Sequence, residues 1–159
     1  MTREFEDGVL IRPFMEGDRD AVNEFFDQMG GETRGFFNKG DGNRKLALKW
    51  FTPERDNWLE PFFVEKDGVM VGYIFLFEAD TYLPELGIAV REDWKGKHLG
   101  RRLIQFLIDY TKERGDGGLM LTTSPANVRG WSLYSRMGFK HMGTYTDGEL
   151  LFIYRHARD

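Results

Sequence analysis

Apolar and polar residues alternate with a period that changes along the chain, and each period predicts an element. "GVLIRPF" (residues 8–14) is a short apolar run that contains a proline near its end, which predicts a strand. Residues 17–31, "GDRDAVNEFFDQMGG", follow a helical spacing instead. We expect an amphipathic helix there, with Asp18 as its N-cap and the glycine pair Gly30 and Gly31 as its stop.

The next segments predict one loop, one short helix and three strands. Residues 32–43, "ETRGFFNKGDGN", are rich in glycine and predict a loop, and residues 44–51, "RKLALKWF", predict a second helix. Two strand-like runs flank an Asp-Gly pair within residues 61–78, which is a strong hairpin signal. Residues 82–90, "YLPELGIAV", are too apolar for a strand that faces water, so we expect it to be buried.

A helical period returns at Leu99 and lasts until Gly115. After it, the pattern predicts a buried strand, a helix and a hairpin, at residues 117–124, 126–138 and 139–156. The order is therefore β-α-α-β-β-β-α-β-α-β-β, without a repeat or a linker. This order predicts one mixed α/β domain over residues 1–159.

Composition narrows the classes of protein. A chain of 159 residues suits one domain with a sizeable core, and 41% hydrophobic residues argue against disorder. There is no cysteine, which excludes disulfides, and three scattered histidines predict no metal site. We find neither a signal peptide nor an apolar run of about 18 residues. We therefore expect no membrane association and a cytoplasmic location.

Charge is more informative locally than globally. The net charge is −4, yet residues 91–102 carry five cations and two anions, so that this segment is +3 and the rest is −7. A nucleic-acid-binding protein usually spreads positive charge over a whole face. One compact cluster better suits a small anionic ligand, and a solvated charged turn is the alternative.

The cationic cluster lies where the strand of residues 82–90 leads into the helix that begins at Leu99. A helix N-terminus presents unpaired N–H groups and a partial positive charge, which bind phosphate. Gly96 and Gly100 let the backbone approach a ligand closely. The segment fits neither the Walker A nor the dinucleotide-binding pattern, and it predicts a pyrophosphate-binding loop. Three cations would add charge around the anion: Lys95, Lys97 and Arg101.

Two motifs resemble the GNAT superfamily of N-acetyltransferases. "KGKHLG" (residues 95–100) resembles the family signature [RQ]-x-x-G-x-[GA], with Gly100 matching and with Lys95 and His98 departing from it. "NVRGWSLYSRMGF" (residues 127–139) resembles the family segment N-x-x-[AG]-x-x-x-Y-x-x-x-G-F. It matches at Asn127, Gly130, Tyr134, Gly138 and Phe139. Residues 11–22 and 69–76 resemble the family's first strand and helix and its third strand, so the resemblance covers essentially the whole chain.

This resemblance implies a single-domain GNAT fold. Its sheet is mixed and mostly antiparallel, with parallel, splayed fourth and fifth strands and helices on both faces. The implied activity is acetyl-CoA-dependent N-acetyl transfer to a primary amine by direct attack on the thioester. The pantetheine arm would lie along Ile88, Ala89 and Val90. The other cofactor-binding residues would be Lys95, Gly96, Lys97, His98, Gly100, Arg101 and Asn127.

Tyr134 is the candidate for the residue that gives a proton to the leaving group. The departing thiolate benefits from a proton, which Tyr134 can supply, and Tyr134 shares a helical face with Asn127, seven residues earlier. The alternatives are a core tyrosine with a satisfied hydroxyl and a simple N-cap at Asn127. Gly130 lies between them, and close approach by a ligand would explain a glycine there.

The base that neutralises the amine is expected to be Glu85. A carboxylate in a partly apolar cleft has a raised pKa, which makes it a better base. An exposed glutamate at the end of a strand, beside Pro84, is the alternative. His98 has a suitable pKa by nature, but its place in the cationic loop favours a structural role or phosphate contact.

The acceptor is expected to be a small-molecule or peptide amine, and polyamines, amino sugars, aminoglycoside-like molecules and protein N-termini all stay open. Its candidate contacts are acidic (Glu32, Asp41, Asp147 and Glu149) and aromatic (Phe36, Phe37 and Trp50). The sequence also leaves open a homodimer and a non-catalytic acyl-CoA sensor of the same fold. A nucleic-acid-binding domain is a further alternative, against which the overall acidity speaks.

Overall fold

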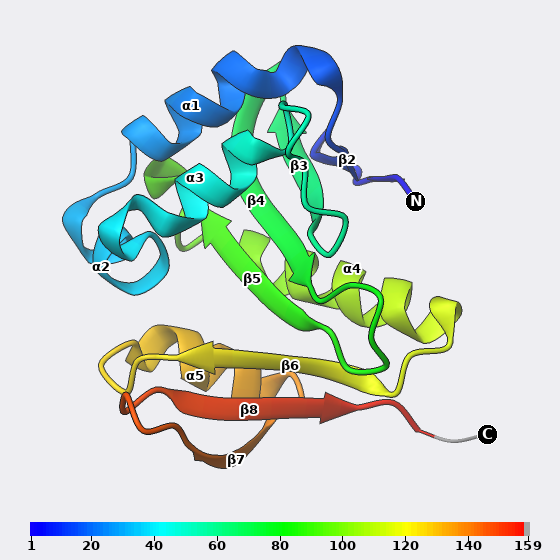
Figure 1. Ribbon diagram of the computed structural model, residues 1–159, viewed down its shortest axis with the longest axis vertical. Coiled ribbons are helices and arrows are strands. Elements are labelled where there is room, and N and C mark those ends of the chain that lie inside the picture. Colours follow the sequence, from blue (N-terminus) through cyan, green and yellow to red (C-terminus); the bar gives the residue numbers. More distant parts are fainter. Residues whose placement is uncertain (158–159) are drawn as a thin grey trace.

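Eight strands form one sheet in the computed structural model, which describes residues 1–157 (Figure 1). Residues 158 and 159, which the one-domain prediction included, lie outside the described residues. The strands are β1 (Arg3–Glu4), β2 (Leu10–Pro13), β3 (Glu60–Lys66), β4 (Val69–Phe77), β5 (Glu85–Val90), β6 (Gly118–Thr123), β7 (Lys140–Thr144) and β8 (Leu150–Arg155). The helices are α1 (Arg19–Asp27), α2 (Gly31–Phe37), α3 (Gly42–Lys49), α4 (Leu99–Arg114) and α5 (Val128–Arg136).

The sheet is mixed, with the strand order β1-β2-β3-β4-β5-β6-β8-β7. Every neighbouring pair is antiparallel except β5 and β6, which are parallel. These two strands are the fourth and fifth predicted ones, so the predicted sheet is confirmed. They start close together and separate toward their C-terminal ends (Figure 1). The two-residue strand β1 was not predicted, because two residues carry no period.

Helices cover both faces of the sheet (Figure 1). Successive side chains of a strand point to opposite faces, so β4 contributes to two separate layers of core. Tyr73 and Phe75 pack in the layer that contains α1 and α3, and Ile74 and Leu76 pack in the layer that contains α4. None of the helices within residues 1–157 is long and apolar enough to cross a membrane.

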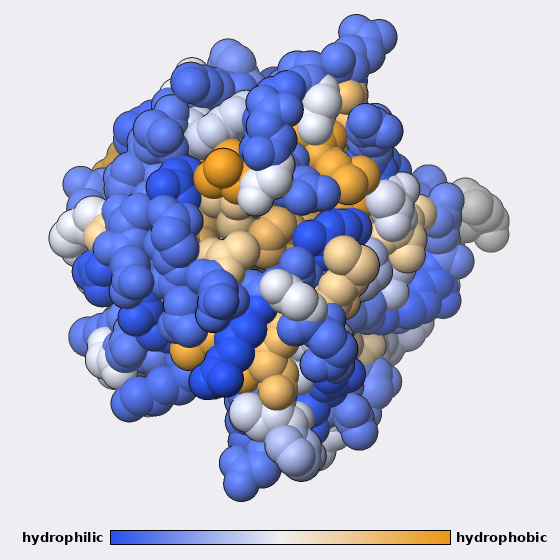
Figure 2. Space-filling view, turned by 90° about the horizontal axis from the view of Figure 1, so that it is seen from above, coloured by the Kyte–Doolittle hydropathy of each residue, from blue (hydrophilic) through white to orange (hydrophobic). Residues whose placement is uncertain are grey.

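Helix α1 is amphipathic, as its pattern predicts. Val22, Phe25 and Phe26 are fully buried, and the surface seen from above, on the side of α1, is mostly hydrophilic with small apolar patches (Figure 2). The predicted role of Asp18 is wrong in one respect, because its side chain does not cap α1. Its carboxylate instead accepts from the Met15 N–H at 2.7 Å and from the Arg12 guanidinium at 2.8 and 2.9 Å.

Helix α2 lies where the sequence predicts a loop. The glycine pair does not act as the stop of α1, which ends at Asp27. Gly30 is the N-cap of α2, and Gly31 is its first residue. This seven-residue helix contains a second glycine, Gly35, so its local helix propensity is weak. Contacts from outside the helix must therefore hold it.

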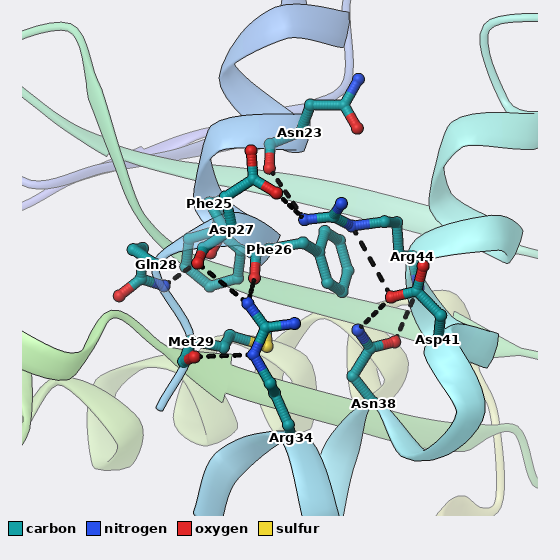
Figure 3. Close-up of polar contacts among 10 residues, drawn as sticks. All are labelled: Asn23, Phe25, Phe26, Asp27, Gln28, Met29, Arg34, Asn38, Asp41 and Arg44. Atoms are coloured by element: carbon teal, nitrogen blue, oxygen red, sulfur yellow. Dashed lines mark hydrogen bonds and ion pairs between the residues drawn. The ribbon is translucent and has the colours of Figure 1, made fainter. Parts of the chain in front are cut away.

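Arg34 of α2 makes such contacts at the C-terminal end of α1, and Arg44 of α3 binds the same end (Figure 3). Arg34 of α2 donates to the carbonyls of Phe26, Asp27 and Met29 at 2.8 to 3.0 Å, which satisfies acceptors that the end of a helix leaves free. Arg44 of α3 donates to the Asp27 carboxylate at 2.6 Å. The two guanidinium groups thus fix α2 and α3 against α1.

Candidate active site

The parallel strands β5 and β6 pair only at their beginnings. The Met120 N–H donates to the Pro84 carbonyl at 3.0 Å, and Glu85 lies opposite Met120, which is the one register pair between these strands within residues 1–157. Beyond it, β5 keeps its partner β4 up to Val90 but has no strand partner on the other edge in the described part of the chain. The backbone of Ile88 to Val90 is thus available to a ligand on that edge.

Two adjoining spaces open at this divergence. An inner cavity of about 330 Å³ is lined by Phe36, Phe37, Asn43, Leu46, Phe75, Phe77, Glu85, Leu86, Gly87, Ile88, Leu121, Thr122, Asn127, Tyr134 and Glu149. An outer groove of about 670 Å³ runs past β5 and the N-termini of α4 and α5. Five residues line both spaces, which therefore meet there: Phe36, Phe37, Ile88, Asn127 and Tyr134.

The N-terminus of α4 lies in the wall of the outer groove. His98 is its N-cap and makes no side-chain hydrogen bond to the first turn, so the first N–H groups of the helix are free to bind an anion. Gly96 has a φ of 78° and His98 a φ of 61°, both in the left-handed region. His98 is exposed and stands at the signature position where glycine, which adopts such a φ without strain, is usual.

The three predicted cations differ in their surroundings. Arg101 is exposed in the groove wall, and no carboxylate pairs with it within residues 1–157. Lys95 also lines the groove, but its ammonium lies 3.2 Å from the Glu92 carboxylate and contacts the Thr33 hydroxyl. Lys97 does not line the groove, and its ammonium lies 5.0 Å from the centroid of the Trp94 ring. Of these three cations, Arg101 is thus the one that both lines the groove and has no carboxylate partner within residues 1–157.

Glu92 joins the cationic loop to α2. Its Oε1 accepts from the Gly30 N–H at 2.9 Å and from the Thr33 hydroxyl at 2.7 Å. Burial raises the pKa of Glu92, but these hydrogen bonds and Lys95 outweigh burial, so the pKa lies below its ordinary value. The ionised carboxylate therefore fixes the start of α2 beside the cationic loop.

Asn127 caps α5 and also lines both spaces, so its role as an N-cap is compatible with contact to a ligand. Its Oδ1 accepts from the Gly130 N–H at 3.3 Å, and its Nδ2 donates to the Thr123 hydroxyl at 3.1 Å. A Cβ on Gly130 would lie 2.4 Å from Nδ2 of Asn127. The Asn127 side chain thus gives a reason for the glycine that needs no ligand, and Gly130 also lines the outer groove.

Tyr134 reaches the junction of the two spaces from α5. Its ring packs against those of Phe139 and Phe152, and its hydroxyl has no hydrogen-bond partner within the described residues. The hydroxyl oxygen is nevertheless not among the fully buried unpaired atoms, so it keeps some exposed surface, and Tyr134 lines both spaces. Burial raises the pKa of Tyr134 to about 12, which keeps the proton on the oxygen at neutral pH. Tyr134 is therefore not a core tyrosine with a satisfied hydroxyl.

Glu85 lies in the inner cavity, half-buried at the start of β5. Burial raises the pKa of its carboxyl, the nearby charge of Glu78 adds to this, and a hydrogen bond from the Thr122 hydroxyl at 3.4 Å opposes it. The pKa is raised overall, as expected for a carboxylate in a partly apolar cleft. Among residues 1–157, no group of three or more acidic, histidine or cysteine side chains is arranged to hold a metal ion.

The residues predicted to contact the acceptor divide between several places. Phe36, Phe37 and Glu149 line the inner cavity, whereas Glu32 lines the outer groove. The other three lie outside both spaces. Asp41 binds Asn38, the Asp147 carboxylate accepts from the Glu149 N–H, and Trp50 packs against Phe14 and Arg55.

Sequence reasoning missed several wall residues. On α5, Arg129, Leu133 and Arg136 line the outer groove, and their spacing of four and three residues places them on one helical face. That spacing was a usable signal, because α5 itself was predicted. Phe75 and Phe77 alternate on one face of β4 and line the inner cavity, but no local pattern separates them from core residues.

Comparison with known proteins places the chain in a family. The model of the Acetyltransferase (GNAT) family matches residues 22–139, and the chain belongs to this family. A curated relative, probable N-acetyltransferase camello of Xenopus tropicalis, is 33% identical over 79 residues. The match spans 48% of this chain and 36% of that protein, so it covers little more than a third of the relative's length.

Solved structures agree on the fold. The ribosomal-protein-S5-alanine acetyltransferase of Vibrio fischeri superposes with a TM-score of 0.77 at 16% identity, over 98% of this chain and 96% of that one. The PaiA N-acetyltransferase of Thermoplasma acidophilum, solved in complex with coenzyme A, superposes with a TM-score of 0.75 at 17% identity, over 94% and 99% of the chains. The protein thus has the GNAT fold that its motifs imply.

Proposed function

We propose that this chain is an acetyl-CoA-dependent N-acetyltransferase that acts on a primary amine, with residues 1–159 as its single domain. One observation carries the proposal. The inner cavity and the outer groove meet at Tyr134, whose hydroxyl is accessible and has no protein partner within residues 1–157. A thioester that enters from the groove and an amine held in the cavity would meet beside a proton donor.

The outer groove fits the donor acetyl-CoA. Its volume of about 670 Å³ lies within the usual range for ligand sites, about 300–1,000 Å³. The free edge of β5 at Ile88, Ala89 and Val90 offers backbone partners for the pantetheine amides. The pyrophosphate would lie on the N-terminus of α4. The groove residues around it are Lys95, Gly96, His98, Gly100 and Arg101, and Asn127 flanks the reacting end.

The inner cavity fits the acceptor amine, with Glu85 as its base. An ammonium group has no lone pair, so it must lose a proton before it attacks. The carboxylate of Glu85, directly or through a water molecule, takes that proton. The raised pKa of Glu85 makes the ionised form a stronger base at neutral pH.

The reaction then exchanges one bond for another. The amine nitrogen bonds to the carbonyl carbon, and unpaired backbone N–H groups of β5 are the donors available to the oxyanion. When the intermediate collapses, the bond from carbon to sulfur breaks, and Tyr134 gives its proton to the leaving thiolate. The second proton of the amine passes to solvent, as does the proton on Glu85, and Tyr134 regains its own from solvent.

A thiol-release assay with acetyl-CoA across a panel of amines tests the proposal. We expect amine-dependent release of free coenzyme A and an acetylated amine of the expected mass. Binding of acetyl-CoA without release for any amine would support the non-catalytic sensor instead. Absence of both binding and release would contradict the whole proposal.

A further inference from the structure

We infer that the acceptor is a primary amine with a single positive charge, joined by a short chain to an aromatic or bulky apolar group. This inference rests on the proposed function and names the substrate class of the same site. It comes from the walls of the inner cavity, which are aromatic on one side and acidic at two points.

The aromatic wall begins at Phe75 of β4. Gly87 is the register partner of Phe75 on β5, and a Cβ on Gly87 would lie 2.1 Å from the Phe75 ring. The ring therefore lies directly on the backbone of β5, which any larger residue at position 87 would prevent. Phe37 of α2 lies beside it, with ring centroids 6.2 Å apart and planes at 53°. Tilted rings at this spacing form a favourable wall for a further ring.

The acidic points lie next to the aromatic wall. Phe77 is the register partner of Glu85, so the two side chains project from the same face of the sheet on neighbouring strands. Glu149 lines the same cavity from the final hairpin. An ammonium group held between these carboxylates would place the rest of the amine against Phe77 and Phe37.

The charge and the size of the cavity disfavour a polycation. Its volume of about 330 Å³ is near the lower end of the range for ligand sites, about 300–1,000 Å³. Beyond Glu85 and Glu149, the lining is apolar or neutral. If both carboxylates hold the reacting ammonium group, a second ammonium group finds no further carboxylate in this lining, and only the weaker attraction of the aromatic ring faces is left to it. One positive charge on an apolar body matches the walls.

Substrate competition tests the inference. With acetyl-CoA at saturation, kcat/KM is measured for 2-phenylethylamine, 1,5-diaminopentane and kanamycin, which differ in aromatic character and charge. We expect kcat/KM for 2-phenylethylamine to exceed the other two values at least about 10-fold. The presence or absence of an apolar group that fills a pocket changes kcat/KM by this order. A higher value for the diamine or for kanamycin would overturn the inference and leave the acetyltransferase proposal intact.

Variants locate the effect within the site. Glu149→Gln should raise KM for 2-phenylethylamine about 10-fold and leave KM for acetyl-CoA unchanged, because it removes a contact to the ammonium group alone. Phe77→Leu should reduce the preference for 2-phenylethylamine over 1,5-diaminopentane. Glu113→Gln, the same change at an exposed position of α4, is the matched control and should alter neither KM. Equal effects of Glu149→Gln and Glu113→Gln would contradict the assignment.

A binding measurement separates this inference from the proposed catalysis. Calorimetry with coenzyme A present measures the affinity for 2-phenylethylamine without any chemical step. If no amine is acetylated but 2-phenylethylamine binds, and binds more weakly to Glu149→Gln, the substrate class holds and the catalytic proposal fails. If 2-phenylethylamine neither binds nor reacts, the inference is wrong, whatever the other amines do.

Discussion

Tyr134 is the residue whose surroundings best fit the proton donor that we propose. The ring of Tyr134 is packed on two others, yet its hydroxyl is not fully buried and has no hydrogen-bond partner within residues 1–157. Its pKa of about 12 keeps the hydroxyl protonated at neutral pH. These properties suit a group that gives its proton only when a thiolate forms.

Tyr134→Phe should therefore lower kcat by about 10²-fold, the usual contribution of one general acid, with little change in KM for acetyl-CoA. Packing should survive, because only an unpartnered hydroxyl is lost. Steady-state kinetics and the melting temperature measure both parts. Tyr154→Phe, which removes a hydroxyl outside both spaces, is the control and should keep parental kcat. A stable Tyr134→Phe protein with parental turnover would remove Tyr134 from the mechanism.

Glu85 should control the acidic limb of the pH profile. Only its ionised form accepts a proton, so kcat/KM should fall as pH drops through the raised pKa of Glu85, which lies above the ordinary value of 4.5. Glu85→Gln should lower kcat/KM by about 10²-fold and remove that limb. The measurement is kcat/KM against pH for both proteins. An unchanged limb in Glu85→Gln would assign the base elsewhere.

The same residue should affect stability with a defined sign. The folded pKa of Glu85 is raised above its unfolded value, so the folded state is favoured fully below pH 4.5, and that advantage is lost as pH rises through the folded pKa. Glu85→Gln should therefore melt at a higher temperature than the parent at pH 7 and show no such gain below pH 4.5. A site residue that lowers stability in its active form is consistent with a role in function.

At the scale of elements, the N-terminus of α4 presents Arg101 unpaired and Lys95 already paired with Glu92. Arg101→Ala should raise KM for acetyl-CoA about 10-fold, since a lost hydrogen bond to a charged group costs about 1.5–3 kcal/mol. Lys95→Ala should raise it less, because part of its charge is neutralised in the free protein. Both should change kcat little, since a remote phosphate contact affects ground and transition states alike.

Lys97→Ala is the matched control for these two variants, because its ammonium lies on the Trp94 ring and outside the groove. The measurement is KM and kcat for acetyl-CoA at a fixed, saturating amine. The order of effects should be Arg101, then Lys95, then Lys97. A larger effect of Lys97→Ala than of Arg101→Ala would show that the loop rearranges when the cofactor binds.

Elements with a clear period could be predicted from the sequence, and elements held by distant contacts could not. The hairpins around Asp67 and Asp147 and the helix α4 carry their own turn and period signals. Helix α2 carries none, since it begins with glycine and is fixed by Arg34 and by Glu92, which is about sixty residues away in the chain.

The same distinction holds for the candidate site. Tyr134, Asn127 and the cationic loop lie within the two segments that resemble family motifs, so the sequence indicated them. The walls of the inner cavity depend on strand register, as in the pairing of Phe77 with Glu85, and on the position of α2. Register follows from the whole sheet, so no single segment reveals it.

At the scale of the whole molecule, the divergence of β5 and β6 interrupts the hydrogen bonding of an otherwise continuous sheet. An unpartnered strand edge inside a fold costs stability, because its backbone groups lose hydrogen bonds that a closed sheet would supply. The gap is bordered by α2 on one face and by α5 on the other, both of which contribute residues to the groove. A ligand that pairs with β5 would restore the missing partners and join the two halves of the sheet.

Acetyl-CoA should therefore stabilise the entire fold. A ligand that binds only the folded state at about 100 times its Kd adds about 2.7 kcal/mol to the free energy of unfolding. For a chain of this length, the melting temperature should rise by about 5–10 °C. Thermal unfolding with increasing coenzyme A measures this, and Arg101→Ala should need a higher concentration for the same rise. The maximal rise should not change, because the variant alters affinity and leaves the folded state intact. A melting temperature that stays constant up to millimolar coenzyme A would contradict the cofactor site, and with it the assignment of the splayed strands to ligand binding.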